Sequence, residues 1–112
     1  IYELPQKFFE VGDVVIPQLK GETVATYRKL AAAWVGGNFT QIKAVVEAVL
    51  RELRFHAVHR EGSHPSFMEG RVVEVQSEGR TIGLYGEVHP LVLQNFELRH
   101  PVAAFELTLG EA

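Results

Sequence analysis

The chain has 112 residues, a formal net charge of −3 and no cysteine. Residues 1–112 fit a single domain or a fragment of one, and the lack of cysteine excludes disulfide scaffolds, thiolate metal sites and cysteine nucleophiles. No apolar run reaches the ~18 residues of a membrane-spanning helix, and the negative charge disfavours direct binding of DNA or RNA. The composition suits a reducing cytoplasm, and a start at Ile1 without methionine indicates a piece of a longer protein.

Two strands are predicted for the first third of the chain. Residues 7–16 are rich in aromatic and β-branched side chains, as strands are, and Gly12 in their middle indicates a bulge or a close backbone approach. Pro17 and the residues up to 22 form a loop. Residues 23–35 could be a helix, but their β-branched start and closing glycines favour a strand, so the two runs predict an antiparallel hairpin.

One amphipathic helix is predicted for residues 40–54. Its apolar positions recur at the spacing that places them on one helix face. These positions are Ile42, Val45, Val46, Val49, Leu50 and Leu53. Asn38 or Thr40 can cap its start, and Glu47 is expected to pair with Arg51 one turn later.

The second half of the chain predicts short strands joined by turns. The strands are expected at residues 55–59, 71–76, 81–86 and 102–109. Glu78 and Gly79 indicate a hairpin turn, and Pro90 opens a short helix that runs to about Phe96. The predicted fold class is therefore α+β, a mostly antiparallel sheet flanked by one long and one short helix.

No residue pattern points to a metal or an acid–base site. His56, His59 and His64 are close in sequence, but positions i and i+3 of a strand face opposite ways, so surface or packed histidines are favoured over metal ligands. Glu10 and Asp13 would face apart for the same reason, and solvated charges are favoured over a paired acid and base.

Nucleotide and hydrolase motifs are also lacking in the sequence. It holds no GxGxxG, no Walker loop and no Gly-x-Ser-x-Gly elbow, and residues 83–86 (GLYG) fall within a predicted strand. Three His-Pro dipeptides, starting at His64, His89 and His100, favour rigid turns and helix starts. The residues thus predict no catalytic, cofactor-binding or metal-ligating position in this chain.

Six stretches, read in order, carry a family resemblance. They are FFEVGDVV, TYRKLAAAW, FTQIKAVVEAVLREL, HPSFMEGR, GLYGEVHPLVLQNFEL and PVAAFEL, and they cover about residues 7–109. Together they resemble the catalytic-like module of the β subunit of phenylalanyl-tRNA synthetase, in its archaeal or eukaryotic form. The resemblance implies the C-terminal portion of a module similar to a class II synthetase catalytic domain, with a dimer-forming helix and the first strands upstream.

The resemblance also implies a role. The family enzyme is an (αβ)₂ heterotetramer that joins phenylalanine to its tRNA with ATP and Mg²⁺, and its chemistry sits in the α subunit. This chain would be a non-catalytic scaffold that packs against α, holds no cofactor itself and meets tRNA only through the full complex.

The sequence agrees with a non-catalytic module. A working class II site needs an arginine on its second-motif strand and another after its third-motif strand to hold ATP phosphates. The first matching strand offers only Lys7, and residues 108–110 follow the last strand without an arginine. For Arg28 and Arg71, a structural ion pair or a contact to α is favoured over nucleotide binding.

Four large aromatic residues could anchor an interface, although each is more often core: Trp34, Phe39, Tyr85 and Phe96. Three other functions stay open. The chain could be a free-standing synthetase-like paralogue that acts as a protein–protein interaction domain. It could retain weak binding of an amino acid or adenylate. Direct contact with tRNA is the third, and the net charge disfavours it.

Overall fold

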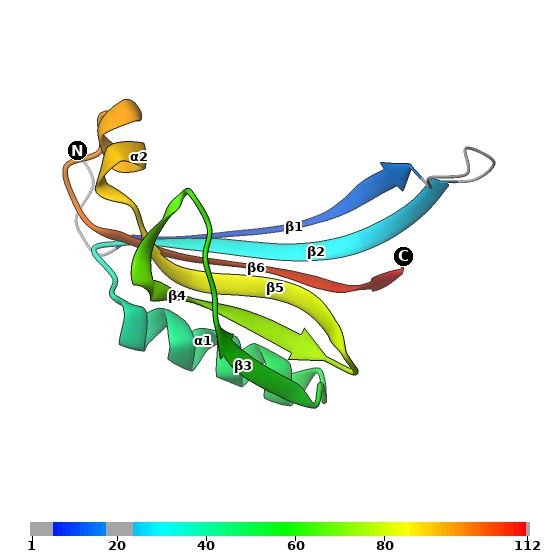
Figure 1. Ribbon diagram of the computed structural model, residues 1–112. Coiled ribbons are helices and arrows are strands. Elements are labelled where there is room, and N and C mark those ends of the chain that lie inside the picture. The colour runs from blue at the N-terminus through cyan, green and yellow to red at the C-terminus, as the bar shows by residue number, and fades with distance from the viewer. Residues whose placement is uncertain (1–5, 18–23, 112) are drawn as a thin grey trace.

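The computed structural model describes residues 6–17 and 24–111. Its elements are β1 (Gln6–Pro17), β2 (Val24–Val35), α1 (Phe39–Glu52), β3 (Ala57–Glu61), β4 (Phe67–Ser77), β5 (Arg80–Val88), α2 (Pro90–Asn95) and β6 (Val102–Glu111). The strands form one antiparallel sheet in the order β1-β2-β6-β5-β4-β3 (Figure 1). The predicted α+β class is confirmed. Neither described helix is long enough to cross a bilayer.

The hairpin of β1 and β2 has an unbroken register from Gln6 opposite Val35 to Pro17 opposite Val24. The strand prediction for residues 23–35 is therefore confirmed over the described part of that range. The interpretation of Gly12 is wrong, because it lies opposite Lys29 without a bulge and a Cβ there would meet open space. The pairing of β1 with β2 is continuous before and after Gly12, so no extra residue is inserted there. Residues 18–22 of the predicted loop lie outside the described ranges.

The start of α1 is set by a capping box. The Gln41 backbone N–H donates to Asn38 Oδ1 at 2.9 Å, and the Asn38 backbone N–H donates to Gln41 Oε1 at the same distance. Asn38, and not Thr40, is therefore the cap. Two donors that the first turn leaves without helical partners are satisfied in this way.

The ion pair on α1 differs from the predicted one. Oε1 of Glu47 lies 3.9 Å from Nζ of Lys43. Glu47 therefore pairs with Lys43, one turn before it, and not with the predicted partner Arg51, one turn after it. The helix ends at Glu52, two residues before its predicted end, and Arg54 turns the chain away with a φ of 60°.

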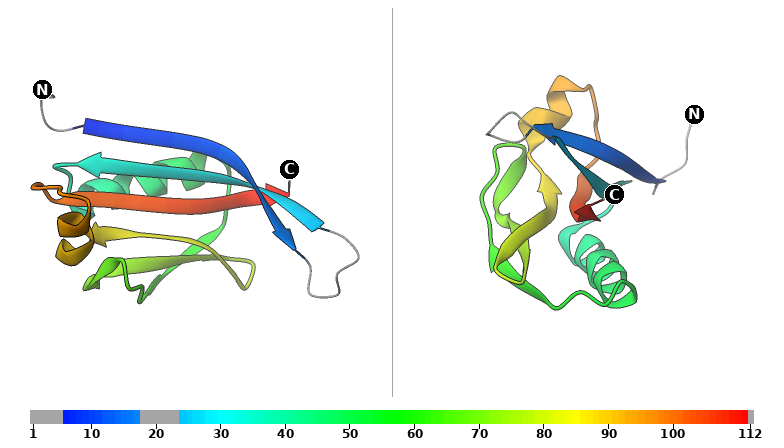
Figure 2. Two further views of the ribbon diagram at one scale, coloured as in Figure 1. Left: turned by 90° about the horizontal axis from the view of Figure 1, so that it is seen from above. Right: turned by 90° about the vertical axis from the view of Figure 1, so that its right-hand side faces the viewer.

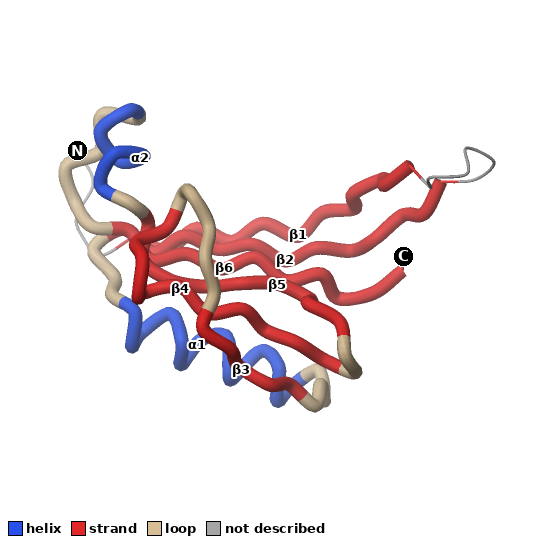
Figure 3. Tube along the Cα trace, viewed as in Figure 1, coloured by secondary structure: helices blue, strands red, loops and turns tan. Residues whose placement is uncertain are grey.

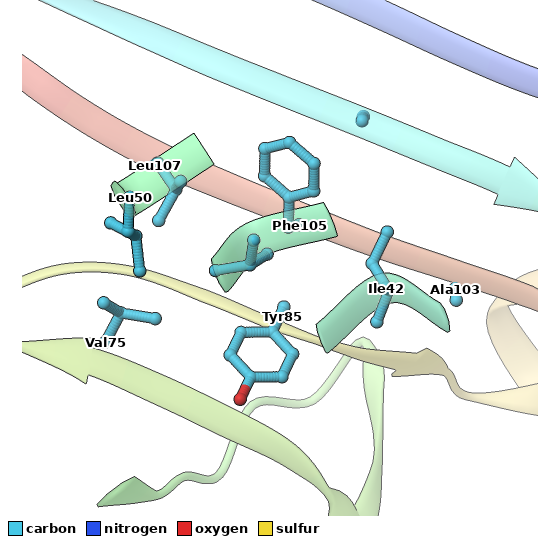
Figure 4. Close-up of a cluster of buried hydrophobic side chains, with 9 residues drawn as sticks. Ile42, Leu50, Val75, Tyr85, Ala103, Phe105 and Leu107 are labelled. Carbon is cyan, nitrogen blue, oxygen red and sulfur yellow. The ribbon is translucent and has the colours of Figure 1, made fainter. Parts of the chain in front are cut away.

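One face of the sheet packs on α1 to form the core (Figure 4). Ile42, Val46 and Leu50 of α1 meet the buried strand residues Val75, Tyr85, Ala103, Phe105 and Leu107. Burial of each large side chain contributes about 1.5–3 kcal/mol. Within residues 6–17 and 24–111, the helices cover one face and one end of the sheet (Figure 3), and no described helix lies across the opposite face.

The second half follows the predicted order with shifted ends. β3 begins two residues later than predicted, and β4 begins earlier because Phe67 already pairs with Val88. Glu78 and Gly79 form the predicted hairpin turn, with φ of 51° and 77°, as a type I′ turn requires. Pro90 is the first residue of α2, as predicted.

Candidate interaction surface

The face of the sheet away from α1 is the candidate functional surface. Residues directly opposite one another in an antiparallel pair share a face, and alternate residues of a strand do so too. We call this surface the open face, and two rows of side chains cross it. They are Phe8, Ala33, Ala104, Gly86, Val72 and, beside them, Glu10, Ala31, Glu106, Leu84, Glu74, Arg60.

The open face contains a hollow of about 510 Å³. Ala31, Ala33 and Ala104 leave its floor low, and Phe8 borders it on the edge strand β1. The opposite wall is formed by His64 and Ser66 of the turn before β4 and by Phe67, the first residue of β4. The result is a shallow apolar depression and not a deep, closed pocket.

The wall of the hollow is held in place locally. The Ser66 backbone N–H donates to Nδ1 of His64 at 3.1 Å, and the His64 ring packs edge-on against Phe67 with centroids 5.5 Å apart. The predicted rigid turn at the first His-Pro pair is therefore confirmed. The second His-Pro pair makes the same kind of contact: Nδ1 of His89 accepts the Leu91 backbone N–H at 3.1 Å and so caps the start of α2.

On the open face, among the described residues, three glutamates outnumber two cations. Glu10, Glu106 and Glu74 occupy one row at intervals of two strands, which is about 10 Å. Of the nearby cations, Lys29 is already bound to Glu106 with Nζ to Oε1 at 2.6 Å, and Arg60 lies opposite Glu74. In the part of the chain that the structure describes, Glu10 has no ion pair.

The two arginines considered as phosphate ligands lie on the α1 side. Alternation along β2 places Arg28 on the face of Leu30, opposite the open face. Arg71 Nη1 contacts both carboxylate oxygens of Glu87, at 2.9 and 3.1 Å, which confirms the predicted structural ion pair. Glu87 Oε2 also accepts the Phe39 backbone N–H at 2.8 Å, at the first turn of α1.

The other titratable groups near the core have structural partners. Tyr85 is 1% exposed, and its hydroxyl lies 2.8 Å from Nδ1 of His59. Burial, helped by the charge of Glu47, raises the pKa of Tyr85 to about 12, so the phenol remains protonated at neutral pH. Across residues 6–17 and 24–111, no three His, Asp or Glu side chains lie together as metal ligands.

The aromatic candidates divide between core and surface. Tyr85 is core, and Phe39 packs on it with ring centroids 5.7 Å apart. Trp34 lies half-buried on the α1 side, with Lys7 Nζ 4.1 Å above its ring. Of the four, only Phe96 is an exposed side chain, at 74%.

Sequence reasoning singled out Phe96 but missed the exposure of Phe8 and of the other apolar side chains around α2. No residue of α2 is buried, and the exposed apolar side chains include Leu91, Phe96 and Leu98. α2 rises above one end of the sheet, on the side away from α1 (Figures 1 and 2). The signal in the sequence was the Phe8-Phe9 pair, because consecutive strand residues face opposite ways. α1 packs on β5 and β6, so both residues of the edge strand β1 stay more than half exposed.

Comparisons with known proteins give one consistent family. Residues 3–109 match the family described as "Phenylalanyl tRNA synthetase beta chain CLM domain". The phenylalanine–tRNA ligase beta subunits of Methanocaldococcus jannaschii and Thermococcus kodakarensis are each 44% identical, over 110 and 111 residues. Both matches cover 96% of this chain but 20% and 19% of the relative, so the chain spans about a fifth of their length.

The fold also matches a solved synthetase. A pyrrolysyl-tRNA synthetase from Desulfitobacterium hafniense superposes with a TM-score of 0.69 at 14% identity, over 97% of this chain and 40% of that one. The predicted likeness to a class II synthetase catalytic domain is therefore confirmed at the level of fold.

Proposed function

The chain belongs to the family of phenylalanyl-tRNA synthetase beta chain CLM domains, and from that premise we propose that it is a non-catalytic scaffold within phenylalanine–tRNA ligase. In this proposal it forms the C-terminal portion of the synthetase-like module. It supports attachment of phenylalanine to tRNA by a separate α subunit in the cytoplasm, and it meets tRNA only through the complex. ATP and Mg²⁺ act in the α subunit, and this chain supplies no catalytic, cofactor-binding or metal-binding residue.

The charge of the open face carries the proposal. Amino-acid activation needs fixed positive charge around the ATP phosphates, because that charge stabilises the transition state. Here the two cations of the described open face, Lys29 and Arg60, each face a carboxylate, and Glu10 adds a negative charge without an ion pair. Lys29 is neutralised by its contact with Glu106, and Arg71 is bound to Glu87 on the other side of the sheet.

Phenylalanine-dependent exchange of pyrophosphate into ATP tests this proposal. The full-length protein that carries this chain is measured alone, with its α subunit, and with the α subunit alone as a control. We expect exchange only when the α subunit is present. Exchange by the protein alone, at a rate comparable to the complex, would contradict a scaffold role.

Calorimetry addresses residual small-molecule binding. The full-length protein is titrated with phenylalanine, with ATP and with a non-hydrolysable phenylalanyl-adenylate analogue. The negative open face predicts no heat of binding for the two phosphate-bearing ligands. Saturable binding of the analogue to the protein without α would favour a retained adenylate site over a scaffold.

A further inference from the structure

We propose that the open face is the docking surface for a segment of the catalytic partner subunit that places an apolar side chain next to a lysine or arginine. The inference rests on the proposed function, because the partner subunit is taken from it. It adds which face of the sheet is covered and what chemistry covers it.

The apolar part of the argument is the hollow and its borders. Phe8 is 56% exposed beside a floor made by Ala33 and Ala104. Leu91 in α2 and Phe96 at its C-terminal cap are 62% and 74% exposed, and α2 itself rises on the side of the sheet away from α1 (Figure 1). An exposed aromatic side chain at the border of an apolar depression is typical of an interaction site, and the low floor leaves room for an inserted side chain.

The charged part of the argument selects the occupant. Glu10 lies on the open face two residues along β1 from Phe8, or about 7 Å away, and it has no ion pair among the described side chains. Glu106 lies on the same row, next to the hollow. Glu10 would repel a polyanion such as tRNA. A lysine or arginine of a partner would instead pair with Glu10, next to the apolar contact.

β1 offers a matched pair of variants. Phe8 and Phe9 are adjacent, and they are 56% and 59% exposed. Phe9 lies opposite Ala32 on the α1 side, while Phe8 lies opposite Ala33 on the open face. Phe8→Ser and Phe9→Ser therefore remove similar exposed apolar surface from one strand and differ in the face that loses it.

Assembly of the full-length protein with its α subunit tests the proposal. The dissociation constant is measured for wild type, Phe8→Ser, Glu10→Lys and Phe9→Ser, with circular dichroism melting as a check on folding. We expect Phe8→Ser and Glu10→Lys each to weaken assembly by about tenfold or more, and Phe9→Ser by less than about threefold. The loss caused by Glu10→Lys should shrink at high salt, since a charge pair is screened.

Several outcomes would overturn the inference. Equal weakening by Phe9→Ser and Phe8→Ser would place the contact at the strand edge or on the α1 side. If the wild-type protein binds the α subunit and Phe8→Ser and Glu10→Lys bind it with the same affinity, the open face is not the docking surface. The scaffold role would remain intact. A loss confined to self-association or to tRNA binding would assign the face to another occupant. If the wild-type protein does not bind the α subunit at all, the scaffold function itself fails, and this inference fails with it.

Discussion

Glu87 joins three elements, and its replacement by alanine tests how the long helix is tied to the sheet. Its carboxylate accepts the Phe39 backbone N–H at 2.8 Å at the start of α1 and contacts Arg71 of β4 at 2.9 Å. The Glu87 side chain is 13% exposed and that of Arg71 is 57% exposed. Glu87→Ala removes both contacts at once.

The expected cost is about 2–5 kcal/mol of unfolding free energy. A hydrogen bond to a charged group contributes about 1.5–3 kcal/mol, and a carboxylate at a helix N-terminus adds about 0.3–1 kcal/mol. The bond to Arg71 adds at most about 1 kcal/mol because solvent screens its exposed guanidinium. Glu87→Gln should lose less than Glu87→Ala, since an amide oxygen still accepts the Phe39 N–H.

Urea unfolding and thermal melting of the chain measure the loss. In a domain of this size each kcal/mol lowers the Tm by about 4–8 °C. Glu69→Gln, at an exposed position of β4, is the control and should change little. If Glu87→Ala melts with wild type while its far-ultraviolet spectrum is unchanged, the carboxylate does not stabilise the start of α1 and the reasoning is wrong.

Three further changes have expected results of different kinds. Asn38→Ala removes one arm of the capping box and should cost about 1 kcal/mol in urea unfolding, and an unchanged midpoint would show that the cap is not formed. Gly83→Ala would force a Cβ into the backbone oxygen of Glu106, so it should cost more than about 3 kcal/mol, whereas Gly12→Ala meets open space and should be nearly neutral. Equal stability of these two variants would contradict the close approach of β5 and β6. Tyr85 has a pKa of about 12 in the folded chain against 10.0 as its ordinary value, because the folded state favours the neutral phenol. The stability that Tyr85 contributes to folding is therefore fully present below pH 10 and is lost as pH rises toward 12. Tyrosinate absorbance during alkaline unfolding should show this late titration, and Tyr85→Phe should remove it.

Under the proposed scaffold role, the two faces of the sheet serve different purposes. The core under α1 uses only one face of the sheet, so side chains on the other face can change with little effect on folding. In the proposed scaffold role, a face whose cations already face carboxylates does not have to hold a nucleotide, while the packed face keeps the fold. The partner contact that we propose for Phe8 and Glu10 uses the same freedom.

Local patterns in the sequence determined the elements and their order. The apolar spacing of residues 42–53, the turn at Glu78 and Gly79, and Pro90 at a helix start each act through a few neighbouring residues. The family also follows from the sequence, because six stretches in order are more specific than any single motif. The choice of a structural ion pair for Arg71 was correct, although its partner Glu87 was not predicted.

Only the tertiary structure decided which distant residues share a surface. Insertion of β6 between β2 and β5 brings Glu106 into one row with Glu10, although one lies near each end of the chain. The placement of α1 over β5 and β6 decides that Phe8 lies on the uncovered face and that Phe9 lies on the opposite one. Strand order and register depend on the packing of the whole sheet and on loop closure, and no local pattern contains that information.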